Sequence, residues 1–185
     1  YTNLFKTKIM IFDFDGVIID STKIKIEEYR NLFSQFTKNK TTLNEITNIY
    51  KNSAGIPRET TLKKVFKEVL AINISNHQVD NLSLDFSKQI FRRLEAIEPL
   101  KGFLEYLAIH KKINKHIISG APNSDVTYLI KKLNLSKYFK SIKGGPLNKK
   151  NEIINIMKLA KVKARDIVYF GDQKNDYIAA KSAGV

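Results

Sequence analysis

Residues 9–15 constrain the fold of this chain more than any other part of the sequence. An unbroken apolar run, Ile-Met-Ile-Phe, leads into two carboxylates two residues apart, Asp13 and Asp15, and then into Gly16. A continuous apolar run before a turn signal is typical of a central parallel strand, which we expect over residues 8–14. Because side chains alternate along a strand, both carboxylates lie on the same side. Two like charges at a buried strand end are costly unless a cation or a proton lies between them; the alternative is a solvated strand end with a polar turn.

Strands and helices alternate in the second half of the chain. Apolar patterns predict strands at 114–118, 139–142 and 166–170, and helices at 101–111, 123–134, 149–160 and 175–183. Such alternation predicts an α/β domain with a doubly wound parallel sheet.

Between residues 21 and 97 the pattern is helical only. Three stretches show apolar faces with helical spacing: Ile24, Tyr29, Leu32 and Phe33; Leu62, Val65, Phe66 and Val69; Leu84, Ile90, Phe91 and Leu94. Residues 52–57 are expected to form a loop between two of these helices. We therefore expect an α/β core formed by residues 1–19 and 98–185, with an inserted α-helical domain formed by residues 20–97.

The net charge of +14 comes almost entirely from lysines spread along the whole chain. Many of them fall on predicted helices, so we interpret them as solvated faces with a general attraction for phosphorylated anions, and we expect no nucleic-acid partner. The sequence has no run of eighteen apolar residues and no cysteine, so we expect no membrane span, no disulfide and no thiolate site. We expect a cytoplasmic protein that is a monomer or a homodimer. Because the chain begins at Tyr1 and stops at Val185 directly after a predicted helix, we also expect a fragment or the ordered part of a longer protein.

Polar segments follow three of the predicted strands. Residues 13–16 follow the first strand, Ser119 and Gly120 follow the strand at 114–118, and the segment Gly-Asp-Gln-Lys-Asn-Asp at 171–176 follows the last. Ligands bind outside the carboxyl ends of the strands in open α/β sheets. We therefore expect the three segments to meet at one edge of the sheet.

With these segments the chain resembles the haloacid dehalogenase superfamily of phosphohydrolases. Asp13-x-Asp15-Gly16 matches the first motif of that superfamily, Ser119 the second, a lysine near position 149 the third, and Gly171-Asp172-x-x-x-Asp176 the fourth. The helical insertion resembles the small α-helical cap of the family, and the most similar group is that of phosphoglycolate phosphatases and β-phosphoglucomutases. The resemblance implies a Rossmann-like three-layer α/β/α core with an inserted cap.

The resemblance also implies a Mg²⁺-dependent phosphatase that works through an aspartyl-phosphate. Asp13 would be the nucleophile, and Asp15 would protonate the leaving oxygen and then deprotonate the attacking water. Asp13, the backbone carbonyl of Asp15 and Asp172 would supply oxygen ligands to Mg²⁺. Asp176 would hold the metal directly or through water; the alternative is a carboxylate that the helix dipole favours at a helix N-terminus.

Further residues would bind the phosphoryl group. The Ser119 hydroxyl and backbone N–H groups at Gly16 and Gly120 would form a cradle, with a turn or cap role as the alternative for Ser119. A lysine at a helix start opposes the helix dipole unless an anion lies nearby. Both Lys149 and Lys150 fit that position; we favour Lys149 and leave Lys150 open.

The loop of the cap resembles the substrate-selecting loop of small-cap relatives. Gly55 and Arg58 are therefore candidate substrate-binding residues, although Arg58 is also consistent with a surface arginine. The substrate would be a small phosphorylated metabolite of the phosphoglycolate or sugar phosphate type. A hexose phosphate mutase of the β-phosphoglucomutase type has the same motifs and is the alternative enzyme. A non-catalytic module that binds phosphate or nucleic acid is the alternative of a different class, and Asp13 and Asp15 weigh against it.

Overall fold

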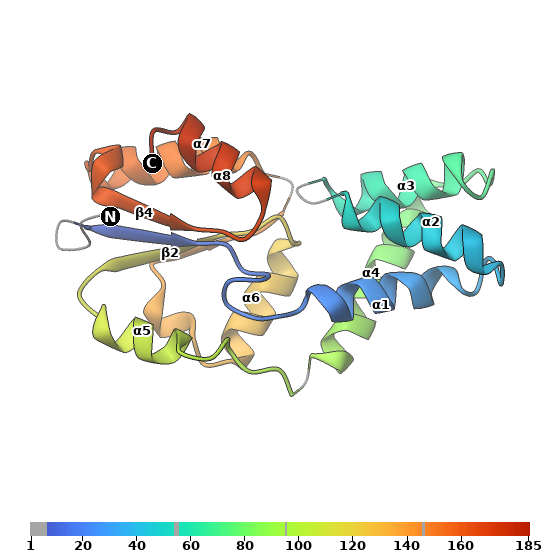
Figure 1. Ribbon diagram of the computed structural model, residues 1–185, viewed down its shortest axis with the longest axis horizontal. Helices are drawn as coiled ribbons and strands as arrows, with labels where there is room; N and C mark the ends of the chain where they lie inside the picture. The colour runs from blue at the N-terminus through green and yellow to red at the C-terminus, as the bar shows by residue number, and fades with distance from the viewer. Residues whose placement is uncertain (1–6, 54–55, 95, 146) are drawn as a thin grey trace. The chain divides into compact units, whose positions relative to one another are not determined.

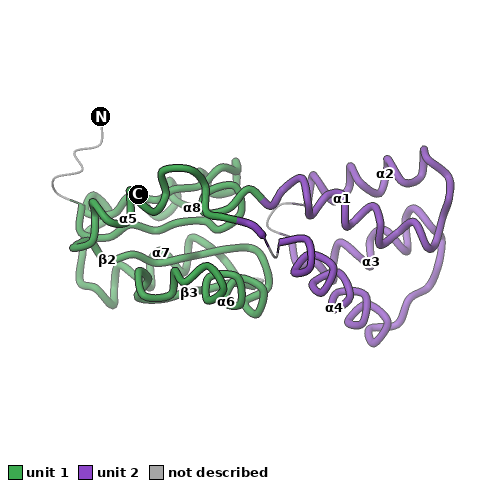
Figure 2. Tube along the Cα trace, turned by 90° about the horizontal axis from the view of Figure 1, so that it is seen from below, with its two compact units in different colours: residues 1–20, 98–185 green, residues 21–97 purple. Residues whose placement is uncertain are grey.

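The computed structural model describes residues 7–53, 56–94, 96–145 and 147–185, and the chain divides into two compact units. One unit joins the residues up to Asp20 to Glu98–Val185, and the other is Ser21–Ile97 (Figure 2). The polypeptide thus leaves the first unit after a single strand and returns to it about eighty residues later.

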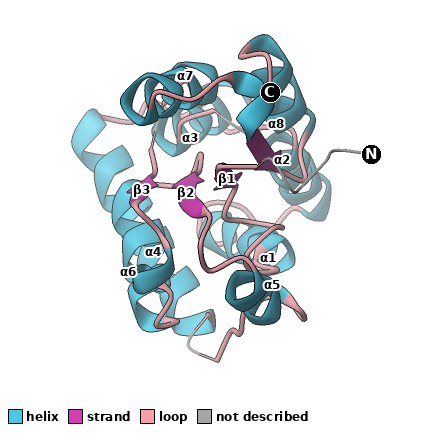
Figure 3. Cartoon of the chain, turned by 90° about the vertical axis from the view of Figure 1, so that its left-hand side faces the viewer, coloured by secondary structure: helices cyan, strands magenta, loops and turns pink. Residues whose placement is uncertain are grey.

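The first unit is built on a four-stranded parallel sheet with helices on both faces (Figures 1 and 3). The sheet order is β3-β2-β1-β4, from β1 (Ile9–Phe12), β2 (Asn114–Ile118), β3 (Ser141–Lys143) and β4 (Ile167–Phe170). Helices α5 (Phe103–Ile109) and α6 (Asn123–Lys132) cover one face, and α7 (Lys149–Ala160) and α8 (Lys174–Ser182) cover the other. Two short 3₁₀ turns, η2 (Ser136–Tyr138) and η3 (Ala164–Asp166), precede β3 and β4. The predicted α/β class with a parallel sheet is confirmed.

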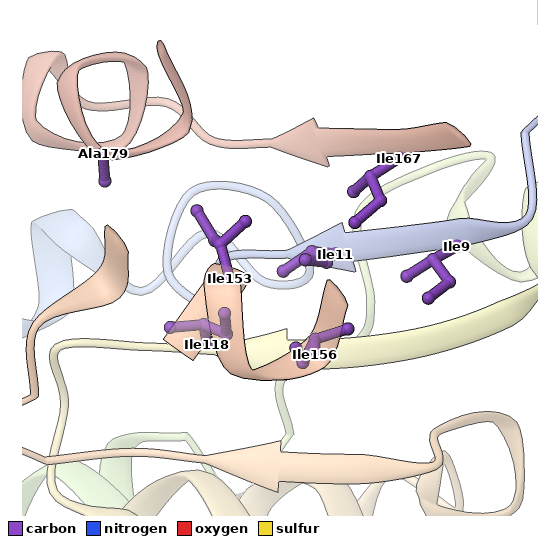
Figure 4. Packing of buried hydrophobic residues seen from close by; sticks show 7 residues of the cluster. All are labelled: Ile9, Ile11, Ile118, Ile153, Ile156, Ile167 and Ala179. Atoms are coloured by element: carbon purple, nitrogen blue, oxygen red, sulfur yellow. The ribbon is translucent and has the colours of Figure 1, made fainter. Parts of the chain in front are cut away.

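The central strand β1 is buried on both faces, which explains its unbroken apolar sequence. On one face, the side chains of Ile9 and Ile11 belong to a cluster that also contains residues of β2, β4, α7 and α8 (Figure 4). These are Ile118, Ile167, Ile153, Ile156 and Ala179. On the other face, the ring of Phe12 stacks on that of Phe170, with ring centroids 4.7 Å apart. Packing on both sides fixes the end of β1, where the two carboxylates follow.

The second unit contains α1 (Thr22–Phe33), α2 (Lys40–Lys51), α3 (Arg58–Glu68) and α4 (Asn76–Arg93). Helix α2 is not among the three helical faces predicted from the sequence, because its apolar side is short: only Leu43, Ile46 and Thr47 are buried. The prediction that Leu84 lies on a buried face was wrong, since its side chain is 59% exposed. The buried side of α4 runs through Ser83 and Ser87, and a step of one residue turns Leu84 about 100° away from it. No helix in the described part of the chain is long and apolar enough to cross a membrane.

Candidate active site

The chain reverses direction immediately after β1. The backbone N–H of Asp13 donates to the carbonyl of Phe170 at 2.8 Å, which extends the pairing of β1 with β4 by one residue. The N–H of Gly16 then donates to the carbonyl of Ile19, also at 2.8 Å. Gly16 has a φ of +76°, a conformation that residues with a Cβ rarely adopt. The turn holds Asp13 at the sheet edge and keeps Asp15 next to it.

Asp13 is a buried carboxylate with one oxygen already engaged. Its Oδ1 accepts a hydrogen bond from the N–H of Phe14 at 2.8 Å and lies 3.1 Å from the ammonium of Lys149. Burial raises the pKa of Asp13 to about 7, Lys149 opposes this rise, and the neighbouring Asp176 and Asp15 add to it. A cation near Asp13 therefore decides whether this group is a carboxylate at neutral pH.

Lys149, the first residue of α7, joins Asp13 to Asp176. Its Nζ lies 2.6 Å from Oδ1 of Asp176 as well as 3.1 Å from Asp13, and its side chain is 14% exposed. Burial alone lowers the pKa of Lys149, but the two carboxylates outweigh that effect and raise it. Lys150, the second candidate from the sequence, is exposed. The contacts thus favour Lys149 as the lysine of this site.

Asp172 and Asp176 approach from the end of β4 and the first turn of α8. A Cβ added to Gly16 would collide with the carboxylate of Asp172, so the absence of a side chain at Gly16 admits this acidic group. Asp176 is 2% exposed, and its Oδ2 accepts the backbone N–H of Gln173 at 3.1 Å. Asp176 therefore combines a helix N-terminal role with membership of the acidic cluster, and the two readings from the sequence do not exclude each other.

The carboxylates fit a hard divalent cation. One oxygen each of Asp13, Asp172 and Asp176 lies within 4.8 Å of the other two. Two oxygens that bind the same Mg²⁺ at about 2.1 Å are at most about 4 Å apart, so a small movement would close the three around an ion. All three donors are carboxylate oxygens, the type that Mg²⁺ prefers. The side chain of Asp15 is not part of this group, and a role for its backbone carbonyl stays a prediction.

Ser119 and Gly120 lie at the same edge, after β2, the strand beside β1. Ser119 is 1% exposed; its N–H donates to the carbonyl of Lys143 at 2.9 Å, and its Oγ accepts the N–H of Ala121 at 3.1 Å. The second bond is a turn interaction, and it leaves the hydroxyl hydrogen available to donate to an anion. Gly120 is exposed.

Arg58 and Gly55, the candidate substrate residues, belong to the helical unit. Gly55 lies outside the described residues. Arg58 begins α3, and its Nη1 donates to the carbonyl of Ser83 at 3.0 Å and to Oγ of Ser87 at 2.6 Å, while its guanidinium lies over the ring of Phe86. These contacts tie α3 to α4, so Arg58 has a structural role within its unit, and a role in substrate binding stays a prediction.

Sequence reasoning missed two residues that contact the acidic cluster. The hydroxyl of Tyr169, in β4, donates to Oδ1 of Asp176 at 3.0 Å, and the side-chain amide of Gln173 donates to Oδ2 of Asp172 at 2.7 Å. Burial, and then the nearby carboxylate of Asp176, raise the pKa of Tyr169 above its usual value, so it stays a donor. The available signal was a single phenol in an otherwise apolar strand, two residues before Gly171.

Comparisons with known proteins agree on one family. A model of haloacid dehalogenase-like hydrolases matches residues 10–185. The chain is similar to the phosphoglycolate phosphatase of Pseudomonas fluorescens strain Pf0-1, with 24% identity over 96% of this chain and 67% of that protein. It is similar to the phosphorylated carbohydrates phosphatase of Thermotoga maritima, with 25% identity over 95% of this chain and 81% of that protein. A structure of CbbY from Rhodobacter sphaeroides in complex with xylulose-1,5-bisphosphate shares the fold, with a TM-score of 0.75, 13% identity, and coverage of 97% of this chain and 84% of that one.

Proposed function

Because the family model spans residues 10–185, this chain belongs to the haloacid dehalogenase-like hydrolases, and we propose that it is a Mg²⁺-dependent phosphatase of small phosphorylated metabolites. The match confirms the resemblance that the four motifs indicated. The observation that supports the proposal best is the buried Asp13, held against Lys149 at the end of the central strand and beside two further carboxylates. Buried charges are costly unless they are paired or coordinate a metal, so a purpose beyond packing is expected of this cluster.

The chemistry proposed for the site begins with Asp13. A free oxygen of its carboxylate attacks phosphorus and forms an aspartyl-phosphate, while the bond from phosphorus to the ester oxygen breaks. Asp15 gives a proton to that leaving oxygen. Asp15 then takes a proton from a water molecule, which attacks phosphorus and releases inorganic phosphate, and Asp13 is regenerated.

Two positively charged groups, the ammonium of Lys149 and a bound Mg²⁺, would support these steps. Lys149 favours the carboxylate form of Asp13 through its contact at 3.1 Å and can also meet a phosphoryl oxygen. Asp13, Asp172 and Asp176 would hold Mg²⁺, with the backbone carbonyl of Asp15; the ion would neutralise charge on the phosphoryl group and orient it. The Ser119 hydroxyl and the N–H groups near Gly120 would bind the remaining phosphoryl oxygens.

The substrate class is proposed from the relatives. The similar curated proteins are named for phosphoglycolate and phosphorylated carbohydrates, and the CbbY structure holds a sugar bisphosphate. We infer a small phosphorylated acid or sugar. A hexose phosphate mutase would use the same residues, and only the product separates it from a phosphatase.

Turnover of para-nitrophenyl phosphate tests the proposal. We expect hydrolysis with Mg²⁺, loss of hydrolysis in EDTA, and recovery when Mg²⁺ is restored. Asp13→Asn should reduce turnover at least about a hundredfold, because an amide is a poor nucleophile, while the melting temperature stays close to that of the parent protein. A pure Asp13→Asn protein that keeps more of the activity would remove Asp13 from the nucleophile role. Release of inorganic phosphate from sugar phosphates would support hydrolysis, and isomerised sugar phosphate without release would support the mutase.

A further inference from the structure

The hydroxyl of Tyr169, a partly buried residue packed against the hydrophobic core, reaches the acidic cluster. Tyr169 pairs with Ile11 across β4 and β1, and its ring packs against the cluster of isoleucines beneath α7 and α8. Its oxygen lies 3.0 Å from Oδ1 of Asp176. Since a carboxylate only accepts hydrogen bonds, the phenol must be the donor. The ring could pack equally well without the oxygen, so the contact with Asp176 is a second role of this side chain.

Asp176 is held by donors from three directions. Oδ1 accepts from Tyr169 and from Lys149, and Oδ2 accepts from the backbone N–H of Gln173. The ammonium of Lys149 is also drawn toward Asp13, at 3.1 Å. With the phenol removed, Lys149 would be the one remaining partner of Oδ1 among the described residues, and the ammonium can shift toward Asp13. The backbone N–H of Gln173 would still hold Oδ2, so Oδ1 would be the oxygen that is free to move.

We propose that Tyr169 is a positioning residue, whose hydroxyl fixes the Asp176 carboxylate so that one oxygen pairs with Lys149 and the carboxylate stays aligned with Asp13 and Asp172. It acts through Asp176 and touches neither substrate nor reacting atoms. Hydrogen bonds that orient a metal-binding side chain commonly change metal affinity about tenfold or more when they are removed. The expected consequence for Mg²⁺ rests on the proposed function, whereas the orientation of Asp176 does not.

The test compares two variants that each delete one phenol oxygen from the same unit. Tyr169→Phe removes the donor to Asp176. Tyr106→Phe is the matched control, because among the described residues the Tyr106 hydroxyl is buried without a hydrogen-bond partner. Isothermal titration of the full chain with MgCl₂ should show about tenfold weaker binding for Tyr169→Phe and an unchanged value for Tyr106→Phe. Equal Mg²⁺ affinity for Tyr169→Phe and the parent protein would overturn the proposal.

Structures determined without metal test the role of Tyr169 independently of the proposed function. Crystal structures of the parent protein and of Tyr169→Phe, both grown in EDTA, should differ in the Asp176 carboxylate, with loss of the 2.6 Å contact between its Oδ1 and Lys149 Nζ in the variant. If Asp176 and Lys149 keep that contact in Tyr169→Phe, the positioning role is refuted. If the parent protein binds no Mg²⁺, the proposed metal site fails, and the EDTA structures alone decide the role of Tyr169.

Discussion

Gly16 offers the sharpest test of the candidate site, because its two special features can be separated. Its φ of +76° penalises any residue with a Cβ, and that Cβ would also collide with the carboxylate of Asp172. Gly102 has a similar φ of +85° but nothing within 4 Å of the position that a Cβ would take. Gly102→Ala is therefore a control with the same backbone strain and no collision.

The expected magnitudes follow from this geometry. Alanine in the left-handed region costs about 1 kcal/mol, which for a protein of this size lowers the melting temperature by about 2–4 °C in both variants. The carboxylate of Asp172 is exposed and can swing away from a new methyl group, so Gly16→Ala should lose little further stability. The same swing removes Asp172 from the other two carboxylates. We expect Mg²⁺ binding to weaken at least about tenfold in Gly16→Ala and to stay unchanged in Gly102→Ala.

Thermal unfolding, Mg²⁺ titration and phosphatase turnover of the two variants make up the assay. In an Asp172→Ala background, any small extra stability cost of Gly16→Ala over Gly102→Ala should disappear, because the colliding atoms are gone. The reasoning is refuted if Gly16→Ala binds Mg²⁺ as tightly as Gly102→Ala. Such a result would mean that Asp172 does not need its place beside Gly16.

Three other predictions follow from the contacts. Lys149→Met leaves two buried carboxylates without their ammonium and should lower the melting temperature by about 10 °C. Lys150→Met, at an exposed position, should change it by less than about 2 °C. Equal effects would contradict the choice of Lys149 as the lysine of the site. In EDTA, the free energy of unfolding should fall as pH rises from about 4 to about 7 and then level off. The pKa of Asp13 is near 3.8 in the unfolded chain and about 7 in the folded one, so the folded protein holds an extra proton between these values. Denaturant titrations of Asp13→Asn should lack this pH dependence. Arg58→Ala removes a charged donor that links α3 to α4 and should lower the melting temperature by about 5 °C, whereas Arg92→Ala, at an exposed position in the last turn of α4, should change it little. Unchanged stability of Arg58→Ala with a raised KM would instead favour substrate binding.

The sequence allowed the carboxyl edge of the sheet to be predicted because strand ends carry their own signals. An apolar run buried on both faces must be central and parallel, and polar residues directly after it must lie at its end. This logic predicted that Asp13, Asp172 and Ser119 lie at the same edge of the sheet. It required only that the strands be parallel, and each pairing in the sheet is parallel.

Other features depend on contacts that one sequence does not encode locally. Lys149 and Lys150 are equivalent as residue types, and only the rotation of α7, about 100° per residue, turns one toward Asp13. Tyr169 fits an apolar strand, and its hydrogen bond exists because α8 brings Asp176 back across the end of β4. Helix α2 was missed because five of its twelve residues are threonine or asparagine and few of its side chains are buried.

The charges of the site explain why its cation and its anion would depend on each other. Asp13, Asp172 and Asp176 bring three potential negative charges, and Lys149 supplies one positive charge. This excess repels a phosphate dianion, and burial, with the neighbouring carboxylates of Asp176 and Asp15, raises the pKa of Asp13 to about 7, which weakens Asp13 as a nucleophile at neutral pH. A divalent cation held by the three carboxylates would favour the carboxylate form of Asp13 and would cancel the remaining negative charge. In the proposed reaction, the cation would therefore be needed both to admit the phosphate and to keep Asp13 ionised.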